Sequence, residues 1–198
     1  GGHTMIVLVK DYFEMEIMGK SIDDAAGEAF DKIGKIMDLD YPAGPIIDRL
    51  AKEGNPHAFT FNKSRLENYD YSFSGIKTSV LYFIQKEIKK NPNFIKENLN
   101  DLCASVQRTI IEILMVKLEK AAKDLEIKEV AIAGGVSANS ALRKAMQDNQ
   151  QKFGWNIYIP KFEYTTDNAA MIAMVAKLKF ERGEFTDLRT TATSKYDL

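Results

Sequence analysis

Residues 131–143 read AIAGGVSANSALR, an apolar run that ends at two glycines and resumes with helix-forming residues. Gly134 and Gly135 can adopt positive φ angles, and because they lack Cβ atoms a ligand can approach their main chain closely. Ser137 or Asn139 would then begin a helix whose free N–H groups point toward an anion. The stretch therefore predicts a phosphate-binding junction between a strand and a helix, but an ordinary turn with a serine cap has the same pattern.

The segments on either side of this junction alternate between strands and helices. We expect a strand at 129–133, a helix from about Ala138, a strand at 155–159 and a last helix at about 167–181. Such an order predicts a layered α/β sheet, in which ligands gather at the carboxyl ends of the strands. The two glycines follow the carboxyl end of the first of these strands.

The N-terminal region predicts a hairpin and a helix. Residues 5–9 (MIVLV) form a continuous apolar run, expected to be a strand buried on both faces, and residues 13–17 alternate like a half-exposed strand. From 22 to 38 the apolar residues recur at helical spacing, with Ser21 in the N-cap position.

The middle of the chain is mostly helical by the same criterion. Its longest predicted helix runs from about Leu99 to Leu125. We therefore expect an α/β domain formed by residues 1–40 and 128–198, with a helical insertion, 41–127, packed on it.

Composition narrows the functional classes. Lys and Arg total 27 against 28 for Asp and Glu, so no strong overall field attracts nucleic acid or a membrane. The single cysteine, Cys103, excludes an internal disulfide and any Cys-x-x-Cys metal site. No apolar run reaches the length of a membrane span, and no secretion signal is recognised. These features predict a cytoplasmic protein that does not bind membranes.

The helix predicted at 22–38 carries a polar ridge formed by Asp24, Gly27, Asp31 and Gly34. Two glycines inside a helix cost roughly 1 kcal/mol each relative to alanine. A bound ligand or a closely packed backbone would offset this cost, and the aspartates could accept hydrogen bonds from hydroxyl groups. The alternative, equally supported by the sequence, is that the ridge is a solvated acidic face in which the glycines are tolerated.

Three further stretches have both a structural and a functional interpretation. In YPAGPIID (41–48) two prolines bracket Gly44, and Asp48 lies about one turn into the next helix, so this is a rigid connection or part of a site. In SFSGIKTS (72–79) hydroxyl groups can cap a helix, or Lys77 can meet a phosphate. In TTDNAAMIA (165–173) Asp167 falls in the first turn of a helix, where it favours the helix dipole or holds a metal with further ligands.

Six stretches together resemble, in order and spacing, the universal tRNA threonylcarbamoyladenosine transferase family, formerly called O-sialoglycoprotein endopeptidases, which includes the bacterial TsaD proteins. They are GGHT (1–4), SIDDAAGEAFDK (21–32), YPAGP (41–45), YSFSGIKTS (71–79), GGVSANSALR (134–143) and TTDNAAMIA (165–173). The resemblance covers nearly the whole chain.

The resemblance implies an actin-like ATPase fold, shared with sugar kinases. It also implies transfer of a threonylcarbamoyl group from its adenylate to the exocyclic amine of an adenosine beside the tRNA anticodon. One divalent metal, Fe²⁺ or Zn²⁺, and an adenine nucleotide, threonylcarbamoyl-AMP or ATP, would be bound. TsaB- and TsaE-like proteins would be partners, and tRNA the substrate of the complex.

The resemblance also assigns roles to individual residues. Asp167 would be a metal ligand, and no catalytic base is assigned. The remaining positions would bind the substrate or nucleotide: Gly1, Gly2, Asp31, Gly44, Asp48, Asn139, and with it Gly134 and Gly135.

In one respect the chain departs from the family pattern. The family completes its metal site with an HxxxH pair, and the two histidines here, His3 and His57, form no such pair. We therefore expect a C-terminal portion that lacks the first strand and the N-terminal domain and is inactive alone. The unpaired edge of the strand at 5–9 would favour self-association. A fragment of an actin-like kinase and a non-catalytic TsaB-like partner are the alternative functions.

Overall fold

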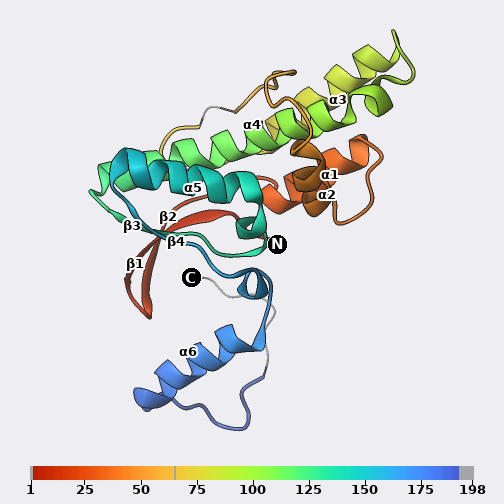
Figure 1. Cartoon of the computed structure of the whole chain (residues 1–198). Helices are drawn as coiled ribbons and strands as arrows, with labels where there is room; N and C mark the ends of the chain where they lie inside the picture. Colours follow the sequence, from red (N-terminus) through yellow and green to blue (C-terminus); the bar gives the residue numbers. More distant parts are fainter. Residues whose placement is uncertain (1, 65, 192–198) are drawn as a thin grey trace.

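The computed structural model describes residues 2–64 and 66–191. In this part of the chain, helices α1 to α5 form one body, two small sheets lie beneath them in the view of Figure 1, and helix α6 stands apart. The elements follow the predicted order, and the α/β class is confirmed. The division into a domain and a helical insertion stays a prediction.

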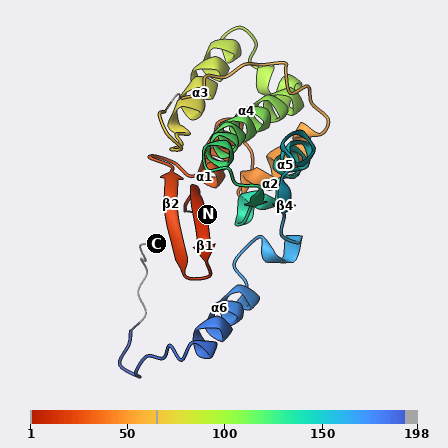
Figure 2. The ribbon, with the colours of Figure 1, turned by 90° about the vertical axis from the view of Figure 1, so that its left-hand side faces the viewer.

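The N-terminal sheet is an antiparallel hairpin of β1 (Met5–Asp11) and β2 (Glu14–Lys20). None of the residues of β1 is fully buried, so the expectation that this strand is buried on both faces is wrong. Val9 is exposed because the far end of the hairpin extends beyond the helical body (Figure 2).

Helix α1 (Ala26–Ile36) begins later than predicted. Ser21 is not its N-cap, because the Ser21 hydroxyl donates to a backbone carbonyl and Ala25 takes the cap position. The side chain of Thr4 instead accepts a hydrogen bond of 2.9 Å from the N–H of Ala26. A partner distant in sequence thus satisfies one of the free donors at the start of α1.

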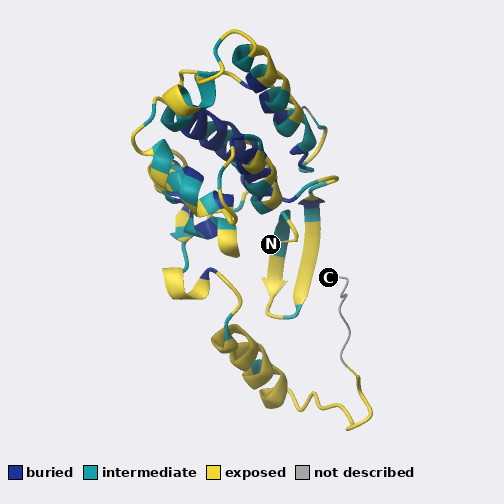
Figure 3. Cartoon of the chain, turned by 90° about the vertical axis from the view of Figure 1, so that its right-hand side faces the viewer, coloured by how far each residue is buried: buried dark blue, intermediate teal, exposed yellow. Residues whose placement is uncertain are grey.

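Three further helices complete the body: α2 (Ala43–Ala51), α3 (Ser74–Ile88) and α4 (Phe94–Asp124). Backbone angles at Asn98 depart from helical values, and the part of α4 after Asn98 matches the predicted long helix. Figure 3 shows the buried residues gathered in these helices. The first hydrophobic cluster combines α1 with α2, α3 and α4, and includes Phe30, Ile33, Ile47, Phe73, Ile76, Val80, Leu102, Val106 and Ile110.

The second sheet pairs β3 (Glu129–Ala131) with β4 (Asn156–Tyr158) in parallel, and α5 (Ser140–Phe153) connects them. This is the predicted βαβ unit. Within the described residues this parallel sheet shares no strand with the β1–β2 hairpin. A second cluster packs α5 and β3 on α4 through Ile111, Met115, Val130, Leu142, Met146 and Trp155.

Helix α6 (Ala169–Glu181) has no buried residue (Figure 3). Just after it, Arg182 contacts the tip of the β1–β2 hairpin through an ion pair of 2.8 Å with Asp11. The large apolar residues of α6 that are exposed are Met171, Ile172, Met174, Val175 and Phe180. Among the helices of residues 2–64 and 66–191, none is long and apolar enough to cross a membrane.

Candidate functional site

The two glycines after β3 form an open turn. Gly134 has φ of 81°, as its lack of a side chain allows, and Gly135 begins a short 3₁₀ helix, η1 (Gly135–Ala138). A Cβ atom added at either glycine would meet nothing within 4 Å apart from its immediate neighbours along the chain. The main chain of this turn therefore faces free space that a ligand could occupy.

The free donors lie in the turn itself and not at the start of α5. The N–H groups of Ala141 and Leu142 both donate to the side chain of Asn139 at 3.0 Å, so Asn139 is the N-cap, as predicted. The N–H groups of Gly134, Gly135 and Val136 have no hydrogen-bond acceptor in the described part of the chain. An anion would therefore bind to the N–H groups of the turn. The expectation that it binds to free N–H groups at the start of the helix is corrected.

A buried glutamine holds the cap in place. Asn139 Nδ2 donates to Gln107 Oε1 at 2.6 Å, and both side chains are buried. Gln107 lies on α4, so this bond fixes the glycine turn against the centre of the helical body. Sequence reasoning missed Gln107, although a glutamine within the apolar stripe of a long helix is a signal for such a role.

Asp48 connects α2 to the same helix start. Its Oδ1 accepts hydrogen bonds from the backbone N–H (3.1 Å) and the hydroxyl (2.7 Å) of Ser140. A carboxylate in this position is favoured by the dipole of α5. Asp48, predicted as part of the same site as the glycine turn, thus contacts the first residue of the helix that follows the turn.

Asp31 is placed at the other end of α2. Its Oδ1 accepts a hydrogen bond of 2.8 Å from the N–H of Ala43, the first residue of α2 and the neighbour of Gly44. Asp31 and Ala43 also line a cavity of about 250 Å³ whose wall includes the exposed ring of Tyr41. The residues that line this cavity do not include the glycine turn, so α2 is what connects Asp31 with Asp48.

The predicted polar ridge is only partly formed. Asp24 precedes α1, and Gly34 is buried. A Cβ atom at Gly34 would lie 2.2 Å from the Cβ of Ala43. Of the two explanations offered for the glycines, close packing is therefore confirmed at Gly34.

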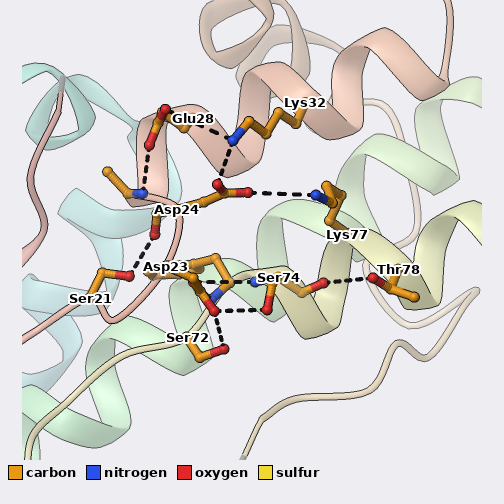
Figure 4. A network of polar contacts seen from close by, with 11 residues as sticks. Ser21, Asp23, Asp24, Glu28, Lys32, Ser72, Ser74, Lys77 and Thr78 are labelled. Atoms are coloured by element: carbon orange, nitrogen blue, oxygen red, sulfur yellow. Dashed lines mark hydrogen bonds and ion pairs between the residues drawn. The ribbon is translucent and has the colours of Figure 1, made fainter.

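A second polar cluster joins the segment before α1 to the start of α3 (Figure 4). Asp23 accepts hydrogen bonds from the hydroxyls of Ser72 and Ser74 and from the N–H of Phe73, at 2.6 to 2.7 Å. Burial opposes ionisation of Asp23, but these hydrogen bonds outweigh it and lower its pKa. Asp23 thus satisfies the start of α3, a role that sequence reasoning missed.

Lys77 is occupied within the same cluster. Its Nζ lies 3.9 Å from Asp24, which also accepts a hydrogen bond from Lys32 (Figure 4). The segment does open helix α3, but its Ser and Thr hydroxyls do not cap the helix as expected, because those of Ser72 and Ser74 donate to Asp23 and the N-cap residue, Phe73, has no side-chain cap hydrogen bond of its own.

Ser137 differs from its neighbours in the turn. It is 1% exposed, and its hydroxyl has no hydrogen-bond partner within the described residues. Buried hydroxyl groups are seldom left without a partner. The open main chain at Gly134 and Gly135 and this unsatisfied hydroxyl are both compatible with a polar ligand at the turn.

The two remaining predicted sites lie toward the ends of the chain. Gly2 is exposed, and Gly1 lies outside the described residues. Asp167 is exposed and precedes α6, whose N-cap is Asn168, so the expectation that it lies in the first helical turn is corrected. No hydrogen bond or ion pair of the described residues links Asp167 to the glycine turn.

The described residues do not supply a complete metal site. No group of three or more His, Cys, Asp or Glu side chains able to hold an ion occurs among them. Asp167 alone does not make a donor set, since sites that fix an ion for catalysis use about three protein ligands. Cys103 is buried, and burial raises the pKa of its thiol to about 12, so its reactivity is low.

The amino-acid sequence is similar to proteins of one family. A model of the TsaD family, described as tRNA N6-adenosine threonylcarbamoyltransferase, matches residues 1–174. A protein of that name from Riemerella anatipestifer is 80% identical over the whole chain. Proteins of the same name from Christiangramia forsetii and Phocaeicola vulgatus are 57% and 55% identical over 99% and 98% of the chain. The chain spans 58% of the length of each of these three relatives.

Proposed function

The chain belongs to the TsaD family of tRNA N6-adenosine threonylcarbamoyltransferases, and from this premise we propose that it binds the adenylate of threonylcarbamoyl-AMP. In the whole enzyme the threonylcarbamoyl group would pass to N6 of the adenosine 3′ to the tRNA anticodon. One observation carries the proposal: three successive backbone N–H groups, at Gly134 to Val136, have no acceptor among the described residues and line an open turn, which leads to the helix start that Asp48 contacts.

The proposed binding mode divides the nucleotide between two segments. The N–H groups of the turn would bind the phosphate, because main-chain donors at such a junction suit an anion. The α2 segment would bind the nucleoside, with Gly44 allowing close approach and Asp31 and Asp48 accepting from ribose hydroxyls. Each of these carboxylates uses Oδ1 within the protein, so Oδ2 would serve the ligand.

Catalysis would come from positioning. Binding energy that holds the acyl adenylate in one orientation lowers the entropic barrier, and main-chain donors favour charge that develops on the phosphate. We assign no general base within this chain. A divalent metal, Fe²⁺ or Zn²⁺, would act as a Lewis acid in the whole enzyme, with Asp167 as one ligand and the others from outside the described residues.

The whole enzyme would have an actin-like fold. We propose that β1, β2, β3 and β4 belong to one sheet, completed by a strand supplied by the additional length of the longer relatives. Two parallel strands of three residues are too few to be stable alone, which supports this view. Cytoplasmic location, TsaB- and TsaE-like partners and tRNA as substrate follow from the family and remain proposals.

Nucleotide binding tests the proposed site. We expect this chain to bind AMP in a calorimetric titration, and Gly135→Leu to weaken the affinity at least tenfold, about 1.4 kcal/mol. The Cβ atom of the added side chain would meet nothing within 4 Å apart from its chain neighbours, so the side chain starts in the open space at the turn. Gln150→Leu adds the same side chain at an exposed position of α5 and is the matched control.

Two further substitutions address the polar groups. Asn139→Ala and Asp31→Ala should each weaken AMP binding, with folding checked by circular dichroism. The proposal would be contradicted if the wild-type chain failed to bind AMP, or if folded Gly135→Leu, Asn139→Ala and Asp31→Ala all bound it with unchanged affinity.

A further inference from the structure

Arg143 joins three segments that are separate in sequence. It lies in the first turn of α5, where its Nε donates to the carbonyl of Ser137 at 2.7 Å. An Nη2–H of the same guanidinium donates to the carbonyl of Pro160 at 2.8 Å. The guanidinium carbon also lies 4.1 Å from the centre of the Phe162 ring. The glycine turn and the segment after β4 are therefore held by one side chain.

This arrangement uses properties that arginine alone provides. The planar guanidinium presents several N–H donors in a fixed fork and stacks on aromatic rings, whereas the lysine ammonium does neither. Both acceptors are neutral carbonyls, and no carboxylate of the described residues forms an ion pair with Arg143. The positive charge beside the glycine turn is therefore not neutralised, which favours an anion there.

The segment held by Arg143 leads directly to Asp167. A short 3₁₀ helix, η2 (Phe162–Tyr164), follows Pro160, and the hydroxyl of the buried Thr165 donates to the carbonyl of Phe162 at 2.8 Å. Beyond it, α6 buries no residue. Arg143 is thus a principal link between the body of the chain and the segment that carries Asp167.

We propose that Arg143 is a positioning residue that fixes the η2 segment, and with it Asp167, relative to the glycine turn. That the anion beside Arg143 is an adenylate phosphate rests on the proposed function. That Arg143 holds the η2 segment against the glycine turn rests on the contacts alone. Its aromatic partner is Phe162, a residue that is 66% exposed.

Distance measurements test the mechanical link directly. Spin labels at Gln150→Cys on α5 and Glu163→Cys in η2 occupy exposed positions, and the buried Cys103 should not react with the label. We expect one narrow distance distribution with Arg143 present and a broad one in Arg143→Gln. Phe162→Leu should broaden it less, because the two hydrogen bonds of Arg143 remain.

Measurements of AMP affinity distinguish the effect of the positive charge of Arg143 from the effect of its hydrogen-bonding geometry. Arg143→Lys keeps the charge and should lower AMP affinity less than threefold while the distance distribution broadens. Arg143→Gln should lower the affinity roughly tenfold and reduce its dependence on salt. Lys144→Gln, which removes an exposed neighbouring charge paired with Asp148, should change neither quantity.

The outcomes are distinguishable. If the distribution stays narrow in Arg143→Gln and Arg143→Lys, the positioning role is overturned. If Arg143→Gln does not fold, Arg143→Lys and Phe162→Leu decide the question by the same measurement. If the wild-type chain does not bind AMP, the proposed function fails, and the distance measurement still decides the role of Arg143.

Discussion

At the scale of single residues, the clearest case is Gly34, which allows α2 to approach α1. The sequence placed it on a polar ridge, but the structure buries it, with the Cβ of Ala43 where a side chain of its own would lie. The local pattern could reveal the cost of a glycine inside a helix. It could not reveal which neighbour compensates, because α2 comes from a later part of the chain.

Replacing Gly34 by alanine should destabilise the protein. Alanine favours a helix by about 1 kcal/mol over glycine, but overlap with Ala43 should cost more, for a net loss of about 1–2 kcal/mol in the free energy of unfolding. Urea denaturation of the wild type and Gly34→Ala measures the difference. A gain of stability, as propensity alone predicts, would show that the two helices move apart easily.

Asp48 and Asn139 show the same limit at the residue scale. The Asn139 cap was predictable, because the N–H groups of Ala141 and Leu142 that donate to its side chain lie within three residues of it. The bond between Asp48 and Ser140 spans 92 positions. The bond of Asn139 to Gln107 spans 32. Neither hydrogen bond can be predicted from the local spacing of residues. The resemblance to a family indicated that Asp48 and Asn139 bind a ligand, but it did not indicate these hydrogen bonds.

At the scale of elements, helix starts depend on acceptors that come from other segments. The predicted βαβ order and the helix α5 are confirmed, because glycine, cap and apolar run are adjacent in sequence. The start of α1 was misplaced, since Thr4 supplies a distant acceptor. The start of α3 likewise depends on Asp23, located about 50 residues earlier.

The cap of α3 should make stability depend on pH. The pKa of Asp23 is lowered in the folded protein, so its contribution is present above the ordinary aspartate pKa of about 3.9 and is lost as pH falls through the folded value. Asp23→Asn should cost about 1–2 kcal/mol at pH 7. This difference should shrink below about pH 4.

Chemical denaturation between pH 3 and pH 7 measures this difference. Asp148→Asn, at an exposed position of α5, is the control and should change stability little at any pH. A difference between wild type and Asp23→Asn that is independent of pH would contradict the assignment of a charged cap.

At the scale of the whole molecule, apolar surface remains uncovered in the described part of the chain. Helix α6 exposes most of its apolar residues, and β1 pairs with β2 along one edge only (Figures 1 and 3). Sequence analysis foresaw the unpaired edge of β1 from the family pattern. It predicted α6 as a helix but made no prediction of how far its apolar residues are exposed.

These surfaces should make the chain self-associate. Sedimentation velocity should show a sedimentation coefficient that rises with protein concentration, because an unpaired strand edge can pair with another chain. Val9→Lys places a charge on β1 and should weaken the association. A single monomeric species at all concentrations, with β1 still accessible to solvent, would be evidence against this prediction.

The central claim is that the main chain of the glycine turn binds the phosphate of an adenylate. The most direct measurement is a titration of the ¹⁵N-labelled chain with AMP, followed by the amide signals in NMR spectra. We predict that the signals of Gly134, Gly135 and Val136 shift together with that of Gly44, with one common dissociation constant. Saturating AMP that shifts other signals and leaves these four unchanged would contradict the claim.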